Sequence, residues 1–264
     1  MGRDRSAISG GLLGLLWGVA AGVPLLLGWL SMGTGWSYPR LLPDLLDAGP
    51  WRYFFDGRRG VGASVATSLG TALVVALIAT PAGLLASRAI RRRGGGWWLL
   101  LGYLPFVISP VVLALSLYDL AARLGVAGSW AGVVAGQAIL ATGFATVLFS
   151  EFWDARTDAL EAQVALLGGD WVARWRHAIW PRAGGLIALV AVQAALLSWL
   201  DYGLAQFLGG GRVETLTVRL FGLIREGSVN LAALAALLLV MPVWLSLAAG
   251  AGWSLWQRKR KERS

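Results

Sequence analysis

The stretch EAQVALLGGDWVARWRHAIWP, residues 161–181, differs from the long apolar segments that precede and follow it. It contains acidic and basic side chains, the only histidine of the chain (His177), the adjacent glycines Gly168–Gly169 and, at its end, Pro181. We expect the chain to turn into the next apolar segment at that proline. A helix resting on lipid headgroups would account for the Trp and Arg content. The order helix, glycine, helix, proline favours instead an element that docks into a groove of another protein.

Capping signals divide this stretch and the residues just before it into two short helices. Thr157 or Asp158 is the expected N-cap of the first helix, and Glu161 completes a capping box if Asp158 is the cap. Gly168 and the glycine after it end this helix, because glycine readily adopts the left-handed conformation. Asp170 is the expected N-cap of the second helix.

The composition indicates a membrane protein. The 264 residues are 57% hydrophobic and only 14% charged, with a mean hydropathy of +0.65, whereas soluble domains are commonly about a quarter charged. A net charge of +9 would suggest nucleic acid in a soluble protein, but basic residues beside apolar segments are typical of the cytoplasmic flanks of membrane helices. The lack of cysteine and the single histidine exclude thiolate and multi-histidine metal sites, so we expect no metal.

Six apolar segments are long enough to cross a bilayer as helices, which takes about 20 residues. The first exceeds the core of a signal peptide, about 7 to 15 residues, so we interpret it as an uncleaved span. No internal repeat or low-complexity linker divides the chain, and we expect one all-α integral membrane domain over residues 1–264. The six segments are Ile8–Leu30, Ala63–Ser87, Trp97–Leu117, Trp130–Phe149, Gly184–Leu208 and Leu231–Leu255.

The distribution of Lys and Arg predicts the orientation of these spans. If the N-terminus lies in the cytoplasm, most of the 23 Lys and Arg residues lie in cytoplasmic segments, as the positive-inside bias requires. Both termini are then cytoplasmic, and the basic sequence RKRKER (258–263) contacts anionic headgroups. Residues 151–183, between the fourth and fifth spans, become a cytoplasmic loop.

This loop resembles the EAA loop of permease subunits of type I ABC importers. The family pattern is Glu-Ala-Ala, three residues, Gly, nine residues and Ile-x-Leu-Pro. Here Glu161–Ala162 begin the pattern, Gly168 takes the glycine position with one extra residue before it, and Pro181 takes the proline position. Six spans with the loop between the fourth and the fifth also match that family over residues 60–256. The chain departs from the pattern at Gln163, Ala178 and Trp180.

The resemblance implies a transport subunit of a bacterial cytoplasmic (inner) membrane and not an enzyme. This chain would pair with a homologue or with itself around a central pathway, and residues 155–182 would form a coupling helix seated in a cytoplasmic ABC ATPase dimer. That ATPase would hold ATP and Mg, since this chain has no G-x-x-x-x-G-K-[ST] loop and we expect no cofactor in it. An extracytoplasmic binding protein would deliver the substrate. The residues implied in coupling are Glu161, Ala162, Gly168, Gly169, Asp170 and Pro181.

Polar residues are few within the expected spans. Asp201 lies near the outer end of the fifth span, where a carboxylate either lies among headgroups, pairs with Arg212, or faces the pathway and accepts a cation beside its aromatic neighbours. The surrounding segment 198–224, with a glycine run followed by Thr-Leu-Thr, resembles permeases for thiamine, polyamines and ferric iron, which implies thiamine or another cationic solute. The candidate pathway residues are Gln137, Gln193, Trp199, Asp201 and Tyr202.

Two other classes of protein stay open. A stand-alone secondary carrier or a channel is the main alternative; a carrier usually has charges at mid-membrane and two related halves, and neither is visible in this sequence. A membrane-embedded enzyme needs converging acids or histidines, whereas His177 stands alone and is interpreted as a solvated or interfacial residue. Co-purification of an ATPase would separate the importer from both alternatives.

Overall fold

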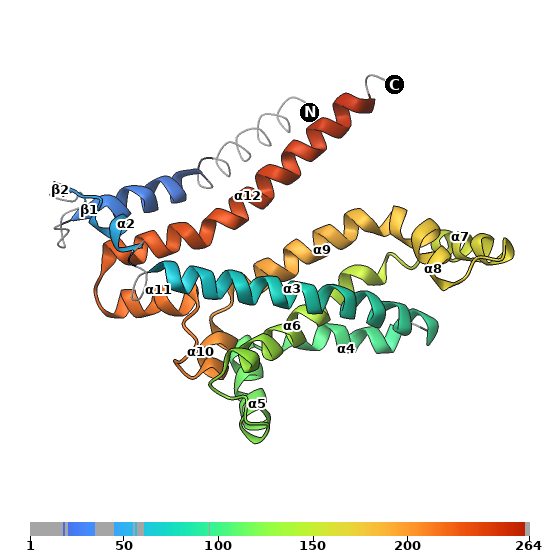
Figure 1. Cartoon of the computed structure of the whole chain (residues 1–264), viewed down its shortest axis with the longest axis horizontal. Helices are drawn as coiled ribbons and strands as arrows, with labels where there is room; N and C mark the ends of the chain where they lie inside the picture. The colour runs from blue at the N-terminus through green and yellow to red at the C-terminus, as the bar shows by residue number, and fades with distance from the viewer. Residues whose placement is uncertain are drawn as a thin grey trace, which may run out of the picture. The chain divides into compact units, whose positions relative to one another are not determined.

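The described residues of the computed structural model are almost entirely helical (Figure 1). They comprise residues 18, 21–34, 45–54, 56, 61–94 and 96–261. The chain divides into two compact units, which we describe separately: a central unit, residues 66–215, and a terminal unit, residues 1–65 with 216–264. The predicted all-α class is confirmed, and the expectation that the whole chain forms one membrane domain stays a prediction.

The terminal unit combines apolar helices with a very short ladder. Strand β1 (Gly33–Thr34) pairs antiparallel with β2 (Leu45–Leu46), with Gly33 opposite Leu46 and Thr34 opposite Leu45. An apolar helix, Ala21–Met32, precedes β1. The remaining helices of this unit are α2 (Gly49–Phe54), α11 (Leu216–Arg225) and α12 (Val229–Lys261).

The central unit is a bundle of helices that carries the candidate site. Its longest helix is α3, of which residues 66–92 belong to this unit and which ends in consecutive arginines. The helices of this unit are α3 (Val61–Arg92), α4 (Gly96–Val107), α5 (Pro110–Arg123), α6 (Trp130–Ser150), α7 (Ala155–Leu166), α8 (Trp171–Arg174), the π-helical turn η1 (Trp175–Ile179), α9 (Trp180–Leu200) and α10 (Gly203–Gly209).

Four helical stretches among the described residues are long and apolar enough to cross a membrane. They correspond to the second, fourth, fifth and sixth predicted segments, and they indicate a membrane protein. The first predicted segment, Ile8–Leu30, lies partly outside the described residues, and six spans with cytoplasmic termini stay a prediction. The four stretches are Val61–Arg92, Trp130–Ser150, Trp171–Leu200 and Val229–Ser246.

The third predicted segment, Trp97–Leu117, is wrong as a continuous helix. Helix α4 ends at Val107, and α5 begins at Pro110. Ser109, between them, has the extended values φ −54° and ψ 137°. A proline disfavours the helical conformation of the residue before it, which explains why the helix breaks at this position.

The fifth predicted segment, Gly184–Leu208, is misplaced at both ends, and the turn expected at Pro181 is wrong. One 30-residue helical stretch runs from Trp171 to Leu200 and includes Pro181 in the first turn of α9. In an ordinary α-helix the proline ring would meet the carbonyl four residues earlier. The preceding π turn, in which the Trp180 N–H donates to the Trp175 carbonyl, widens the helix at this point and lets it continue.

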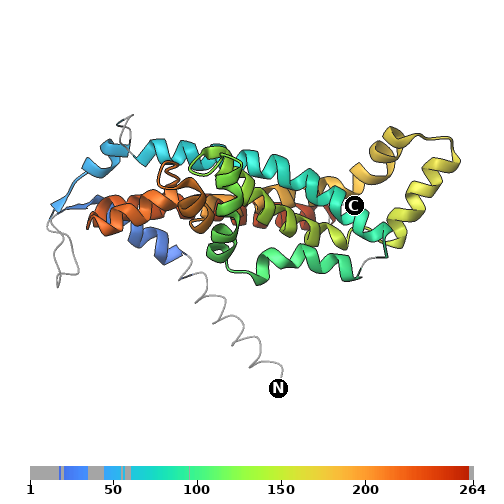
Figure 2. The same cartoon turned by 90° about the horizontal axis from the view of Figure 1, so that it is seen from below.

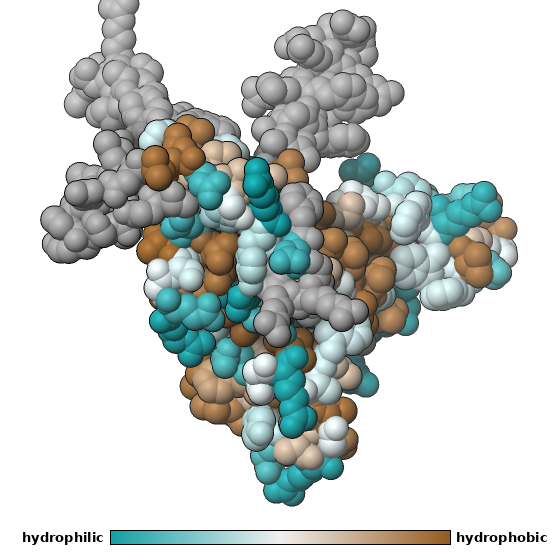
Figure 3. All heavy atoms as spheres, turned by 60° about the vertical axis from the view of Figure 1, so that its left-hand side comes forward, coloured by the Kyte–Doolittle hydropathy of each residue, from teal (hydrophilic) through white to brown (hydrophobic). Residues whose placement is uncertain are grey.

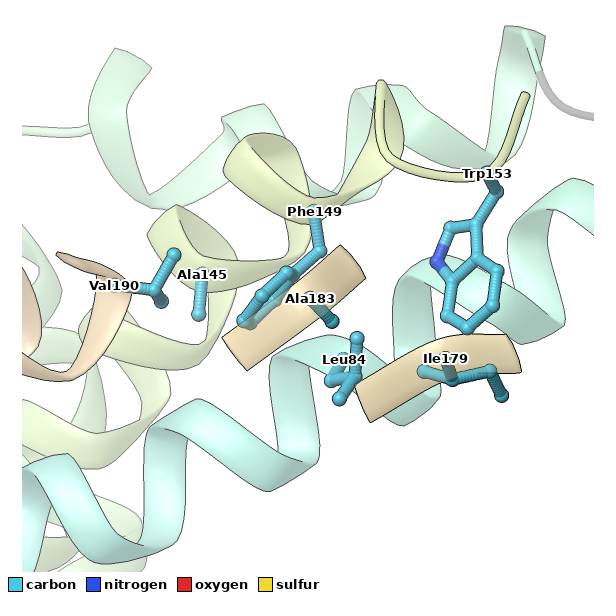
Figure 4. Close-up of a cluster of buried hydrophobic side chains, with 7 residues drawn as sticks. All are labelled: Leu84, Ala145, Phe149, Trp153, Ile179, Ala183 and Val190. Carbon is cyan, nitrogen blue, oxygen red and sulfur yellow. The ribbon is translucent and has the colours of Figure 1, made fainter. Parts of the chain in front are cut away.

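A buried apolar cluster joins three of the spans in the central unit (Figure 4). It also includes Trp153, whose indole Nε1 donates to Ser87 Oγ of α3 at 2.8 Å. Helices α3 and α6 approach so closely that a Cβ added at Gly83 would overlap Ala145. The cluster consists of Leu84, Ala145, Phe149, Trp153, Ile179, Ala183 and Val190.

Large apolar side chains also cover much of the described surface (Figure 3). Leu69, Leu73 and Leu77 recur every four residues along α3, and each is more than half exposed. In water such a stripe would be unfavourable, so it requires lipid or another protein helix as its surroundings.

Candidate functional site

Helices α7 and α8 form a hairpin beside the end of α3 (Figure 2). Its first helix begins at Ala155 because Asp154 is the N-cap and accepts a hydrogen bond from the Thr157 backbone N–H at 2.8 Å. The expected cap at Thr157 or Asp158 is therefore wrong by a few residues. Asp154 satisfies a free N–H of the first turn, so the helix starts one turn earlier.

Glu161 does not complete the expected capping box. It forms an ion pair with Arg88 of α3, and the two side chains are only 16% and 13% exposed. The Arg88 guanidinium also lies 5.1 Å from the centre of the Trp153 ring. A charge-assisted hydrogen bond shielded from water is stronger than an exposed one, so this pair fixes α7 against the end of a span.

A second ion pair holds the start of α7 to α9. Arg182 donates to both carboxylate oxygens of Asp154, at 3.1 and 3.2 Å, and also to the Thr157 hydroxyl. The Arg182 guanidinium, followed by the Thr157 backbone and hydroxyl donors, holds the pKa of the Asp154 carboxyl well below its usual value. The carboxylate is thus ionised at neutral pH, and the hairpin is tied to two different spans.

The turn between the two helices is confirmed where the sequence predicts it. Gly168 has φ +78°, a left-handed conformation that glycine adopts without strain. At Gly169, a Cβ would overlap Val164 of α7. Asp170 then caps α8 by accepting from the Ala173 N–H at 2.8 Å, as expected for a cap residue.

The tip of the hairpin exposes apolar side chains. Leu166 and Leu167 are each 88% exposed, and Val172 beyond the turn is exposed as well, whereas Trp171 lines a pocket with the end of α3. Ala162 lies on the exposed side of α7, and Pro181 lies outside the hairpin in α9. The tip has the character of a docking surface, because adjacent exposed leucines on a fixed helix have an unfavourable contact with water.

The predicted pathway residues do not form one group. Gln137 is buried and central: it accepts from the Ser198 hydroxyl at 2.6 Å and donates to Asp201 Oδ2 at 2.8 Å. Trp199 is buried near this network and Tyr202 is half-buried, whereas Gln193 is exposed elsewhere on α9.

Asp201 acts as a structural acceptor in this arrangement. It ends α9 in an extended conformation, with φ −71° and ψ 129°. Its carboxylate accepts from the backbone N–H groups of Leu204 and Ala205, at 3.3 and 2.9 Å, and so caps α10. Its predicted role toward a cationic solute gains no support from this geometry, because several lone pairs are already used within the chain.

Three residues that position the hairpin, Arg88, Asp154 and Arg182, were not among the predicted site residues. Arg88 counted only as a positive charge beside a span, and Asp154 and Arg182 were not singled out. Asp154 carried a usable signal, since an aspartate three residues before Thr157 is a possible N-cap. The described residues contain no group of three or more His, Cys, Asp or Glu side chains that would hold a metal ion.

No protein-family model and no curated protein matches this sequence.

Proposed function

We propose that this chain is the membrane-spanning permease subunit of an ATP-driven ABC importer, with the α7–α8 hairpin as its coupling helix. The observation that carries the proposal is the exposure of Leu166 and Leu167 on a hairpin whose base is fixed by the ion pairs Arg88–Glu161 and Asp154–Arg182. A helix that presents an apolar tip in one orientation suits insertion into a groove of another protein.

The two ion pairs give the hairpin a way to move the spans. Glu161 connects α7 to α3 through Arg88. Asp154, the N-cap of α7, connects the start of that helix to α9 through Arg182. The second arm, α8, continues through η1 into α9 without a loop. A displacement of the hairpin tip would therefore be transmitted to two spans, α3 and α9, through a continuous helix and two ion pairs. These connections are stiffer than a flexible loop.

The remaining parts of the importer belong to the same proposal. A cytoplasmic ATPase dimer would bind ATP and Mg at its own sites, and a second permease, identical or homologous, would complete the pathway. An extracytoplasmic binding protein would deliver a small solute across a bacterial cytoplasmic membrane, with both termini of this chain in the cytoplasm. We keep thiamine or another cationic solute as the substrate class from the sequence resemblance alone.

The proposal is tested by co-purification. Tagged chain is purified from membranes of its own host, and the ATPase activity that accompanies it is measured with and without L166D/L167D. We expect ATPase activity with the unchanged chain and a loss of about tenfold or more with the aspartates, since apolar anchors at an interface commonly contribute about 2 kcal/mol or more. The matched variant L166M/L167M keeps apolar side chains and should retain the activity.

Two outcomes would contradict the proposal. Absence of ATPase activity from the unchanged chain would favour a stand-alone carrier or a channel. Equal ATPase activity in the L166D/L167D and L166M/L167M preparations would remove the hairpin tip from the interface.

A further inference from the structure

We propose that a pocket at the basic end of α3 binds the phosphate headgroup of an anionic phospholipid. The pocket has a volume of about 340 Å³ and lies between the last turns of α3 and the start of α8. Its position beside a membrane-spanning helix does not depend on the transport function proposed above. The lining residues are Leu85, Arg88, Ala89, Arg92, Arg93 and Trp171.

The pocket carries positive charge that the described residues do not neutralise. Glu161 pairs with Arg88, and the neighbouring Arg91 lies 3.7 Å from Asp158. The Arg93 guanidinium lies 5.8 Å from the centre of the Trp98 ring, and this uncharged ring does not neutralise the positive charge of Arg93. For Arg92, the described part of the chain provides no ion pair. Guanidinium groups match phosphate oxygens in geometry and charge, so the expected ligand is a phosphate.

Part of the pocket lining is apolar, which favours a lipid over free phosphate. Leu85 is 57% exposed and Trp171 is 60% exposed. Leu85 lies one helical turn before Ala89, toward the apolar length of α3. Tryptophan is enriched at membrane interfaces, and basic pockets between membrane helices on the cytoplasmic side bind acidic headgroups. A phospholipid would contact both parts of the lining, with its phosphate at the arginines and its glycerol and upper chains against Leu85 and Trp171.

A bound lipid would also brace the hairpin. Trp171 belongs to α8, whereas Arg88 and Arg92 belong to α3 and Arg93 directly follows it, so the lipid would connect α8 to α3 beside the Arg88–Glu161 pair, which joins α7 to α3. The lipid would therefore act as an additional contact between the hairpin and the span.

The experiment measures lipid binding to the purified full chain in a neutral detergent by native mass spectrometry. The probes are dioleoyl phosphatidylglycerol and, as the neutral lipid, dioleoyl phosphatidylcholine. We expect the unchanged chain to prefer phosphatidylglycerol, and R92Q/R93Q to weaken its binding by about tenfold or more, since each basic residue near a headgroup contributes appreciably. Excess inorganic phosphate should not displace the lipid.

The matched control is R156Q/R176Q. It removes the same charge from two exposed arginines outside the pocket, and we expect its affinity for phosphatidylglycerol to stay within about threefold of the unchanged chain. Circular dichroism on both variants verifies that the helical fold is retained. An equal loss in the two double variants, no preference over phosphatidylcholine, or displacement by inorganic phosphate would each overturn the lipid assignment.

Discussion

The α7–α8 hairpin and the network around Gln137 are both held by polar contacts, but they differ in what they leave exposed. At the hairpin, ion pairs lie at the base and apolar leucines lie at the exposed tip. Around Gln137, the hydrogen bonds connect α6, α9 and α10 and use the polar groups of Asp201 within the chain. The first arrangement suits an external partner, whereas the second fixes the packing of the unit itself.

This difference shows that a polar residue in a membrane protein can have a structural role and need not belong to a substrate path. A polar group inside the bilayer is commonly interpreted as part of a substrate path. Asp201 instead accepts hydrogen bonds from N–H groups of a helix end that would otherwise be free, and Gln137 donates to its carboxylate. The exposed leucines Leu166 and Leu167, although apolar, are a stronger indication of a binding site than Gln137 and Asp201 are.

Reversing the charge of Glu161 should have the largest effect. E161K places a cation beside Arg88, so the pair becomes repulsive and the hairpin separates from α3. Removing one partner of a shielded pair commonly costs about 3 kcal/mol or more, and we expect at least about a tenfold loss of the ATP-driven uptake proposed above, at unchanged membrane insertion.

A swap and an exposed pair serve as controls for E161K. R88E/E161R restores opposite charges and should recover part of the uptake, although the contact of Arg88 with Trp153 is lost. D158K breaks the exposed pair with Arg91 and should have little effect, since exposed pairs contribute about 0 to 1 kcal/mol. Wild-type uptake in E161K would refute the anchoring role.

Removing the Gln137 side-chain amide should lower stability but leave the docking surface intact. In Q137L, the Ser198 hydroxyl and Asp201 lose the hydrogen bonds that Gln137 makes to them. A buried polar group left unpaired costs about 1 to 3 kcal/mol, which should lower the unfolding midpoint measured by circular dichroism in detergent. The co-purified ATPase activity should be unchanged.

The exposed Gln193 is the matched control for Q137L, because it lies on the same span as Ser198. Q193L should change stability by less than about 0.5 kcal/mol. Equal destabilisation by Q137L and Q193L would show that the network contributes nothing to the packing of the unit.

Local signals in the sequence were sufficient for the turn of the hairpin and insufficient for its anchoring. Gly168 and Asp170 could be predicted because a helix stop and an N-cap depend on a few adjacent residues. The partner of Glu161 could not be predicted, since Arg88 lies 73 residues away and only the packing of α3 against α7 brings the two together.

The course of the helices shows the same limit. A single π turn lets the helix continue through Pro181. Hydrophobic periodicity does not reveal such a turn in the sequence. The break before Pro110 had a local cause, the restriction of the preceding residue, but the apolar composition on both sides obscured it. Composition predicts apolar length well and helix continuity poorly.

Substituting Gly168 should have a moderate effect confined to the hairpin. In G168V, a β-branched residue must adopt φ +78°, which costs about 1 kcal/mol or more. The tip should shift, and ATPase co-purification should fall by about fivefold. G168N is the control, because asparagine tolerates the left-handed conformation. Equal retention of ATPase by both variants would show that the tip geometry is not required.

Acidification should give the smallest effect, at the second anchor of the hairpin. The pKa of Asp154 is lowered in the folded chain by the Arg182 guanidinium and the Thr157 donors. A lowered pKa means that the pair stabilises the fold above the unfolded value of about 4, and that this contribution is lost as the pH falls from there through the folded pKa. The difference in unfolding midpoint between the unchanged chain and R182Q should therefore be largest near neutral pH and shrink below about pH 3. Because Asp154 is about half exposed, with 48% of its side chain accessible, high salt should also reduce the difference.

R176Q, which removes an exposed arginine that makes no ion pair among the described residues, should show no such dependence on pH. A difference between R182Q and the unchanged chain that stays constant from neutral pH down to about pH 2 would assign the effect of Arg182 to its contact with Phe152, at 5.5 Å from the ring centre, and not to the carboxylate.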